Sequence, residues 1–148
     1  MNRRPLILIS PNVETRGVEF GDFSVSTSSK YEEAVLAAEG LPLTMPATVS
    51  REIVADCVSR SDGVMLTGGD DVDPRLYSNG LSKKALATVE VTPDGGRRDY
   101  RELLLIAEVF RQRKPLLAIC RGHQILNLIP PLGCHIGGLL RPRSPIAG

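Results

Sequence analysis

Four short apolar runs recur along the chain, and each is followed by a polar or glycine-containing segment. They are Pro5–Ser10 (PLILIS), Leu41–Pro46 (LPLTMP), Asp62–Thr67 (DGVMLT) and Pro115–Ile119 (PLLAI). Apolar runs of this length without polar alternation are typical of strands that are covered on both faces of a sheet. The pattern therefore predicts four buried strands.

Between these runs, apolar residues recur at the spacing of one helix face. A capping-box pattern joins Ser29 to Glu32, and Gly40 is the expected C-cap of the helix that follows. Ser50 is the expected N-cap of the next helix. Helices are predicted over residues 31–40, 51–60, 98–113 and 121–129. Their expected buried faces comprise Tyr31, Val35 and Ala38, then Ile53, Val54, Cys57 and Val58, then Leu103, Leu104, Ala107 and Phe110.

Two polar stretches lack such periodicity and are predicted to be loops, namely residues 13–28 and 68–96. Strands that alternate with helices indicate an α/β fold, an open and mostly parallel sheet with helices on both faces and right-handed crossovers. In such sheets the functional site lies beyond the carboxyl ends of the strands. Two loops of interest are expected there, Gly68–Pro74 and Cys120–Gly122.

The composition narrows the classes of function. The chain has 148 residues, of which 42% are hydrophobic and 24% charged, with a formal net charge of +1, and this suits one globular domain with its own core. A charge near zero and an aromatic content of 4% argue against nucleic acid and membrane surfaces as partners. The apolar run after Arg4 is too short for a signal peptide or a membrane span.

An odd number of cysteines without framework spacing argues for a reducing compartment, so a cytoplasmic location is expected. The three are Cys57, Cys120 and Cys134. Two histidines and no C-x-x-C pair argue against structural zinc. Asp70, Asp71 and Asp73 lack the glycine and glutamate positions of a calcium loop, and Asx hydrogen bonds that shape the loop are expected of them. We expect no metal or cofactor.

The segment Ala118-Ile119-Cys120-Arg121-Gly122 has the spacing of a nucleophile elbow, with cysteine in the nucleophile position between two small residues. The following helix directs its positive end at the sulfur, and Arg121 adds a cation, so both favour the thiolate. The N–H of Arg121 is one candidate oxyanion donor, and the Gly68-Gly69 loop is expected to supply a second. Spacing alone leaves open that Cys120 is buried and inert.

Three sequence blocks resemble those of class I glutamine amidotransferase-like proteins, in the gamma-glutamyl-gamma-aminobutyrate hydrolase branch. They are YEEAVLAAEGLPLTMP, DGVMLTGGDDVDPRLY and AICRGHQILN, and the resemblance extends from Pro5 to Asn127. It implies a flavodoxin-like sheet and a cysteine hydrolase of gamma-glutamyl amides that works through a thioester. By motif position, Cys120 matches the nucleophile, while Arg121 and a glycine of the Gly68-Gly69 loop, Gly69 above all, match the oxyanion donors. Gln124 matches a glutamine that lines the glutamyl pocket, although the alternative is a solvent-exposed helix residue.

The sequence departs from the family pattern after Asn127. The family completes its site there with a histidine and a glutamate, whereas residues 128–148 are rich in proline, glycine and arginine. We therefore expect one domain over 1–127 that lacks the C-terminal part of the fold, and a poorly ordered tail over 128–148. A frameshift or premature stop is favoured over a natural short paralogue. His123 and His135 are weak candidates for the base, since neither is placed to face the thiol.

Three functions follow as hypotheses. The first is a hydrolase of a small gamma-glutamyl substrate, nearly inactive as this chain because the histidine and glutamate are absent. The second is a glutaminase subunit that delivers ammonia to a partner synthase. The third is a non-catalytic fragment that binds a ligand or partner. A sheet that ends after its fourth strand also leaves an edge uncovered, so marginal stability or self-association is expected.

Overall fold

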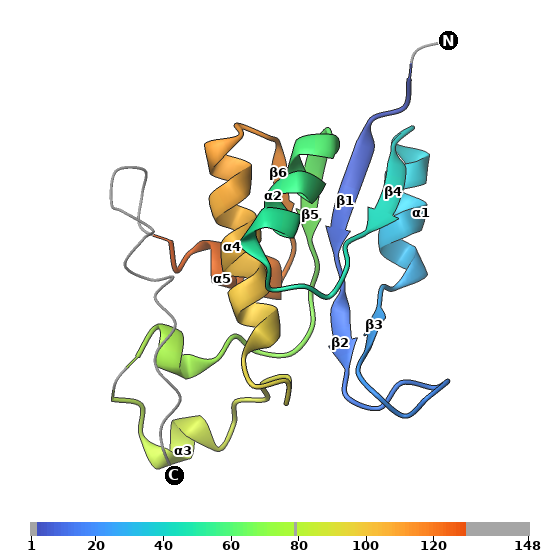
Figure 1. Ribbon diagram of the computed structural model, residues 1–148. Coiled ribbons are helices and arrows are strands. Elements are labelled where there is room, and N and C mark those ends of the chain that lie inside the picture. Colours follow the sequence, from blue (N-terminus) through green and yellow to red (C-terminus); the bar gives the residue numbers. More distant parts are fainter. Residues whose placement is uncertain (1–2, 79, 130–148) are drawn as a thin grey trace.

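A four-stranded parallel sheet organises the chain in the computed structural model, which describes residues 3–78 and 80–129 (Figure 1). The strand order is β4-β1-β5-β6, and every neighbouring pair is parallel. The strands are β1 (Leu6–Ser10), β4 (Leu41–Thr44), β5 (Gly63–Leu66) and β6 (Leu116–Ala118). The four predicted strands and the α/β class are thus confirmed.

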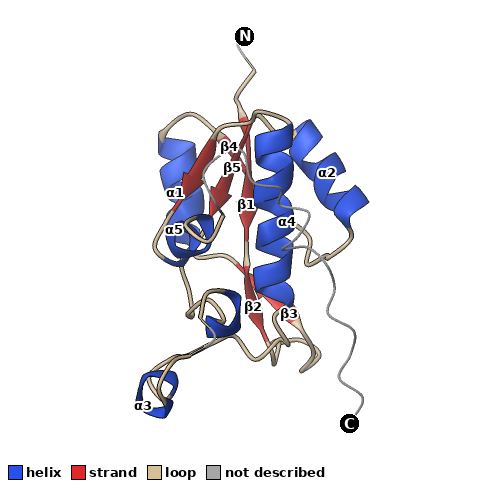
Figure 2. Ribbon diagram, turned by 90° about the vertical axis from the view of Figure 1, so that its left-hand side faces the viewer, coloured by secondary structure: helices blue, strands red, loops and turns tan. Residues whose placement is uncertain are grey.

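Helices cover both faces of this sheet (Figure 2). One face carries α1 (Ser29–Ala37), and the opposite face carries α2 (Arg51–Arg60) and α4 (Arg97–Arg111). The short helix α5 (Arg121–Leu126) packs against α4 and against β5 and β6. Two further helical turns, η1 (Pro74–Leu76) and α3 (Lys83–Leu86), interrupt the long connection between β5 and α4.

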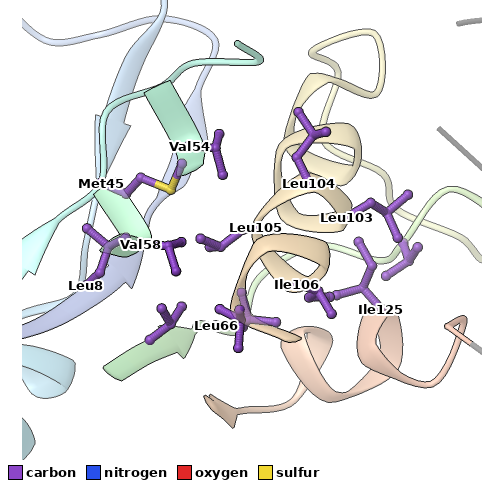
Figure 3. Packing of buried hydrophobic residues seen from close by; sticks show 13 residues of the cluster. Leu8, Met45, Val54, Val58, Leu66, Leu103, Leu104, Leu105, Ile106 and Ile125 are labelled. Carbon is purple, nitrogen blue, oxygen red and sulfur yellow. The ribbon is translucent and has the colours of Figure 1, made fainter. Parts of the chain in front are cut away.

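Two apolar clusters hold these layers together. The smaller one lies under α1 and contains Ile9, Val35 and Met65. The larger one joins the sheet to α2, α4 and α5, and Figure 3 shows its side chains meeting from both sides of α4. Its fully buried members include Met45, Val54, Val58, Leu66, Leu105, Ile106 and Ile125. Because α4 has neighbours on both sides, it buries residues from more than one side of the helix.

This arrangement corrects the predicted helix faces. Phe110 is 38% exposed and Ile53 is 48% exposed, although both were expected inside. In α4 the predicted Leu103 and Leu104 are buried, and burial extends to Leu105, Ile106 and Val109, which helical spacing alone did not select. Cys57 does pack against the larger cluster as predicted, and burial raises the pKa of its thiol, with the nearby Asp56 carboxylate adding to the rise.

Three local predictions were also wrong. The stretch 13–28, expected to be a loop, contains an antiparallel hairpin of β2 (Asn12–Glu14) and β3 (Ser24–Ser26). Three-residue strands carry too few side chains for an alternating pattern to be recognised. The N-cap of α1 is Ser28 rather than Ser29, since its hydroxyl accepts from the Lys30 N–H. The left-handed residue after that helix is Glu39, at φ 61°, and not Gly40.

At one edge of the sheet, β6 pairs only with β5 among the strands that the structure describes. Its middle residue, Leu117, is 53% exposed. Leu128 and Ile129 pack against the larger cluster, and the rest of the tail expected over 128–148 lies outside the described residues. None of the helices within 3–78 and 80–129 combines the length and hydrophobicity that a membrane span needs.

Candidate active site

Cys120 has a strained backbone conformation at the junction between β6 and α5. Its φ of 51° and ψ of −109° lie outside the regions that a non-glycine residue adopts without strain. Such strain costs about 1–3 kcal/mol and persists only where the surrounding packing enforces it. The residue is exposed and its thiol is free. The structure therefore places a bare sulfur at a sharp strand-to-helix turn.

Gly122 shows what enforces this turn. A Cβ added at Gly122 would lie 2.6 Å from the Cβ of Leu66 and 2.8 Å from its carbonyl oxygen. The first turn of α5 thus rests directly on the last residue of β5. Only glycine permits this approach. Because α5 lies so close to β5, the backbone between β6 and α5 must turn sharply.

The loop after β5 reaches the same place. A Cβ added at Gly68 would lie 3.5 Å from the Cβ of Cys120. The Gly68 N–H donates to the Tyr31 hydroxyl at 3.0 Å and is therefore already used. Gly69 follows at φ 137°, a conformation that favours glycine, and its N–H has no acceptor among the described residues. The N–H of Arg121 likewise has none within that part of the chain.

The side chain of Arg121 does not supply the free cation that the sequence led us to expect beside the thiol. It is 1% exposed and forms ion pairs with Asp99 and Glu102 inside the protein. Its charge is thus compensated by two carboxylates of α4. What Arg121 offers to the cysteine side is its backbone N–H, which begins α5.

A buried charge network connects the two loops, and sequence reasoning missed it. Glu102 is fully buried and accepts from Ser10 Oγ at 2.9 Å, from Arg98 Nε at 3.2 Å and from Arg121 Nη1. Arg98 Nη2 in turn donates to the Gly68 carbonyl oxygen at 2.7 Å. One carboxylate therefore holds the glycine loop through Arg98 and the elbow through Arg121.

The pKa values reflect this burial. Loss of solvent lowers the pKa of Arg98, although the Glu102 carboxylate opposes the shift. Loss of solvent also raises the pKa of Asp99 against the opposing effect of Arg121. The four charged groups of the network are Arg98, Asp99, Glu102 and Arg121, and each depends on the others for its charge partner. The sequence held one sign of this network: Arg98 and Glu102 are four residues apart, which puts both on one side of α4.

Two polar residues of α5 flank the cysteine. Gln124 is exposed one turn beyond Cys120, and its backbone N–H donates to the Cys120 carbonyl at 3.1 Å. His123 is exposed on the same helix, and within the described chain no hydrogen bond joins its ring to the thiol. His135 and Cys134 lie outside the described residues.

The aspartates after Gly69 shape their loop, as predicted. Asp71 accepts from the Glu90 N–H at 3.1 Å, and Asp73 accepts from the Arg75 N–H at 2.9 Å. Asp70 accepts from the Thr92 hydroxyl at 3.0 Å. No group of three or more potential metal ligands gathers anywhere in residues 3–78 and 80–129.

The sequence profile of the Peptidase C26 family matches residues 5–139, a span that includes the elbow, the glycine loop and α4. The chain belongs to the Peptidase C26 family. This confirms the class I glutamine amidotransferase-like membership that the three sequence blocks indicated.

Individual relatives match most of this chain. Protein NtpR of Enterococcus hirae is 33% identical over 127 residues, which are 84% of this chain and 50% of NtpR. The putative glutamine amidotransferase-like protein RP404 of Rickettsia prowazekii is 26% identical over 133 residues, 87% of this chain and 44% of that protein. The gamma-glutamyl-gamma-aminobutyrate hydrolase PuuD of Escherichia coli is 32% identical over 109 residues, 72% of this chain and 39% of PuuD. The chain spans half or less of the length of these Peptidase C26 relatives.

Proposed function

We propose that this chain carries the nucleophile centre of a cysteine hydrolase that acts on gamma-glutamyl amides. The observation that supports this most is the strained, exposed Cys120, which the glycine loop approaches at Gly68 and which the Arg121 N–H directly follows. The N–H groups of Gly69 and Arg121 have no acceptor within the described chain, and two such donors would suit a reaction in which an amide carbonyl gains negative charge. Membership in the Peptidase C26 family is consistent with hydrolysis of this bond type.

In the proposed reaction, the Cys120 thiolate attacks the carbonyl carbon of the gamma-amide. The carbonyl oxygen becomes an oxyanion and accepts hydrogen bonds from Gly69 and Arg121. When the intermediate collapses, the C–N bond breaks and the amine leaves with a proton taken from solvent, so that a gamma-glutamyl thioester remains. Water then attacks the thioester and the C–S bond breaks, which releases the gamma-carboxylate, restores the thiolate and returns two protons to solvent. Gln124, one turn along α5, is proposed to contact the glutamyl group.

Acylation and deacylation make different demands on the protein. The attacking sulfur is ionised more easily than a hydroxyl, whereas attack by water on the thioester needs a general base. By resemblance, the family's histidine and glutamate follow residue 127 in positions that this sequence does not match. We therefore predict that the chain forms the thioester and turns over slowly, with a loss of about 10²- to 10⁴-fold from the missing base.

The experiment measures the release of nitroaniline from gamma-glutamyl-p-nitroanilide by the full chain. The expected result is a burst of nitroaniline near one equivalent per chain, then slow release, with the burst abolished in Cys120→Ser. Cys57→Ser is the matched control and should keep the burst. Iodoacetamide labelling at neutral pH should select Cys120 over Cys57, whose thiol has a raised pKa. Nitroaniline release that is equal in Cys120→Ser and in the unchanged protein would refute the proposal.

A second candidate uses the same cysteine. RP404 carries the name of a putative glutamine amidotransferase-like protein, which suits a glutaminase that passes ammonia to a partner synthase. Glutamine hydrolysis that rises when a synthase is added would favour this candidate, whereas gamma-glutamyl-p-nitroanilide turnover that is independent of any partner favours the first.

The class of binding partner and the cellular location of this protein are also proposals. We propose a small gamma-glutamyl compound as substrate, with no nucleic acid or membrane partner, because the net charge is only +1. A cytoplasmic location is proposed from the odd cysteine count. Fractionation of cells that express the tagged chain tests the location.

A further inference from the structure

A pocket apart from the candidate active site lies where the β2–β3 hairpin meets the N-terminal end of α4. Both ribbon views place these two elements beside each other (Figures 1 and 2). The pocket has a volume of about 200 Å³. Its walls come mainly from Val13 and Phe23 of the hairpin region, Ala47 and Val49 after β4, and Arg97 and Arg101 of α4. It shares no lining residue with the candidate active site.

Arg101 is the unusual component of this wall. It is 2% exposed, and its Nη2 donates to the Pro11 carbonyl oxygen at 2.6 Å. Its Nε and Nη1 have no acceptor in the part of the chain that the structure describes, and no carboxylate there forms an ion pair with it. The buried Arg98 and Arg121, by contrast, are both paired with carboxylates. A buried guanidinium without a counter-ion is costly, and an anion in the adjoining pocket would reduce that cost.

The pocket has two other charged groups, Arg97 and Asp94, which are of opposite sign. Arg97 is exposed and has no ion pair among residues 3–78 and 80–129. Asp94 lines the pocket too, but its carboxylate already accepts from the backbone N–H groups of residues 96, 97 and 98 at the start of α4. The negative charge of Asp94 is therefore largely compensated by the N-terminus of α4. Arg97 and Arg101 then make the electrostatic potential in the pocket positive.

The remaining walls are mainly apolar, with the hydroxyl residues Ser24 and Thr48 among them. Val13, Phe23, Ala47 and Val49 face the pocket and offer no hydrogen bonds. An inorganic anion with oxygens on all sides would leave several of them unpaired against these side chains. A ligand that is charged at one end and apolar at the other satisfies both halves of the pocket.

We propose that this pocket binds a small organic monoanion, a carboxylate with an apolar body, whose carboxylate meets Arg101 and Arg97. A planar carboxylate matches the paired donors of a guanidinium. The apolar body lies against Phe23 and Val49. The site is separate from Cys120 and does not depend on the proposed hydrolase activity.

The test is a titration of the isotope-labelled full chain with phenylacetate, followed by amide chemical shifts in NMR. Saturable shifts are expected at residues 47–49 and 94–101. Phenylacetamide, the neutral analogue, and inorganic phosphate should each bind at least about tenfold more weakly, because one lacks the charge and the other the apolar body. Cys120→Ser should bind phenylacetate unchanged, which separates this proposal from the proposed function.

Two variants at exposed positions test the site without disturbing the buried arginine. Arg97→Gln should weaken phenylacetate binding about tenfold, and Ala47→Trp should abolish it by filling the pocket. Lys30→Gln removes a positive charge from the opposite face and should change nothing. The proposal is overturned by the absence of saturation up to about 10 mM phenylacetate, by binding that survives Ala47→Trp, or by equal binding of phosphate.

Discussion

The hydroxyl oxygen of Tyr31 accepts a hydrogen bond from the Gly68 backbone N–H at 3.0 Å. This bond ties the first turn of α1 to the loop that follows β5, two segments that are 37 positions apart. In the proposed reaction this bond leaves Gly69 rather than Gly68 as the oxyanion donor, because the Gly68 N–H is already engaged. Tyr31 is therefore a positioning residue for the glycine loop.

Tyr31→Phe is expected to slow acylation about 3- to 10-fold, since it removes one neutral hydrogen bond worth about 0.5–1.5 kcal/mol. The phenyl ring keeps its packing in the smaller cluster, so the melting temperature should stay nearly unchanged. The burst rate with gamma-glutamyl-p-nitroanilide measures the effect. Iodoacetamide labelling of Cys120 should not change, because the thiol itself is untouched. An unaltered burst rate would show that the loop does not depend on this bond.

Gly122→Ala is expected to destabilise the fold by about 1–3 kcal/mol, because the new methyl group would lie 2.6 Å from Leu66 Cβ and 2.8 Å from its carbonyl oxygen. Relief requires α5 to move off β5, so the acylation burst should fall as well. Gly80→Ala is the matched control, since nothing lies within 4 Å of a Cβ at Gly80. Urea unfolding compares the two variants, and equal stability for both would contradict the proposed close contact.

Glu102→Gln is expected to cost about 3–5 kcal/mol, because it leaves the buried Arg98 with a neutral partner and leaves Arg121 with Asp99 as its one carboxylate. That loss is large against the 5–15 kcal/mol that typically separates folded and unfolded domains. Glu33→Gln breaks an exposed pair with Lys30 and should change stability by less than about 1 kcal/mol. Denaturant midpoints at one pH measure both. If the two variants unfold alike, the network does not hold the loops together.

Asp62 provides a test of pH dependence. Its carboxylate accepts from the Leu6 N–H at 2.7 Å, and this bond, with Arg3 and Lys114 nearby, holds its pKa below the usual range. A carboxyl whose pKa is lowered in the folded state stabilises the fold above its unfolded pKa and loses that effect as the pH falls through the folded pKa. The melting temperature of Asp62→Asn should thus lie below that of the unchanged protein near pH 7 and converge with it in acid. A gap that is constant with pH would contradict the assignment.

Leu117 tests the prediction that the chain self-associates through the β6 edge of its sheet. It is 53% exposed on β6, which pairs only with β5 among the described strands. Sedimentation of the unchanged chain should show a concentration-dependent mass, and Leu117→Glu should shift it toward the monomer. Leu36→Glu, at a residue that is 46% exposed on α1, is the control and should leave the association unaltered. A mass that stays monomeric at every concentration would contradict the prediction.

Features that depend on a few neighbouring residues could be predicted from the sequence. The four strands follow from short apolar runs, and Ser50 caps α2 as predicted, since its hydroxyl accepts from the Ile53 N–H. The turn at Cys120 follows from the small residues on either side of it, because a narrow strand-to-helix junction needs them. The assignment of Cys120 as nucleophile remains a prediction, although the structure leaves the residue exposed.

Features that depend on what packs against a segment were decided only by the tertiary structure. Helical spacing cannot tell that α4 is buried on two sides, or that Phe110 stays partly exposed. The sequence placed the Arg121 charge beside the thiol, but the carboxylates of α4 draw that side chain into the interior. Burial and charge pairing depend on residues far apart in the chain, whereas strands, caps and turns are set by local backbone and side-chain chemistry.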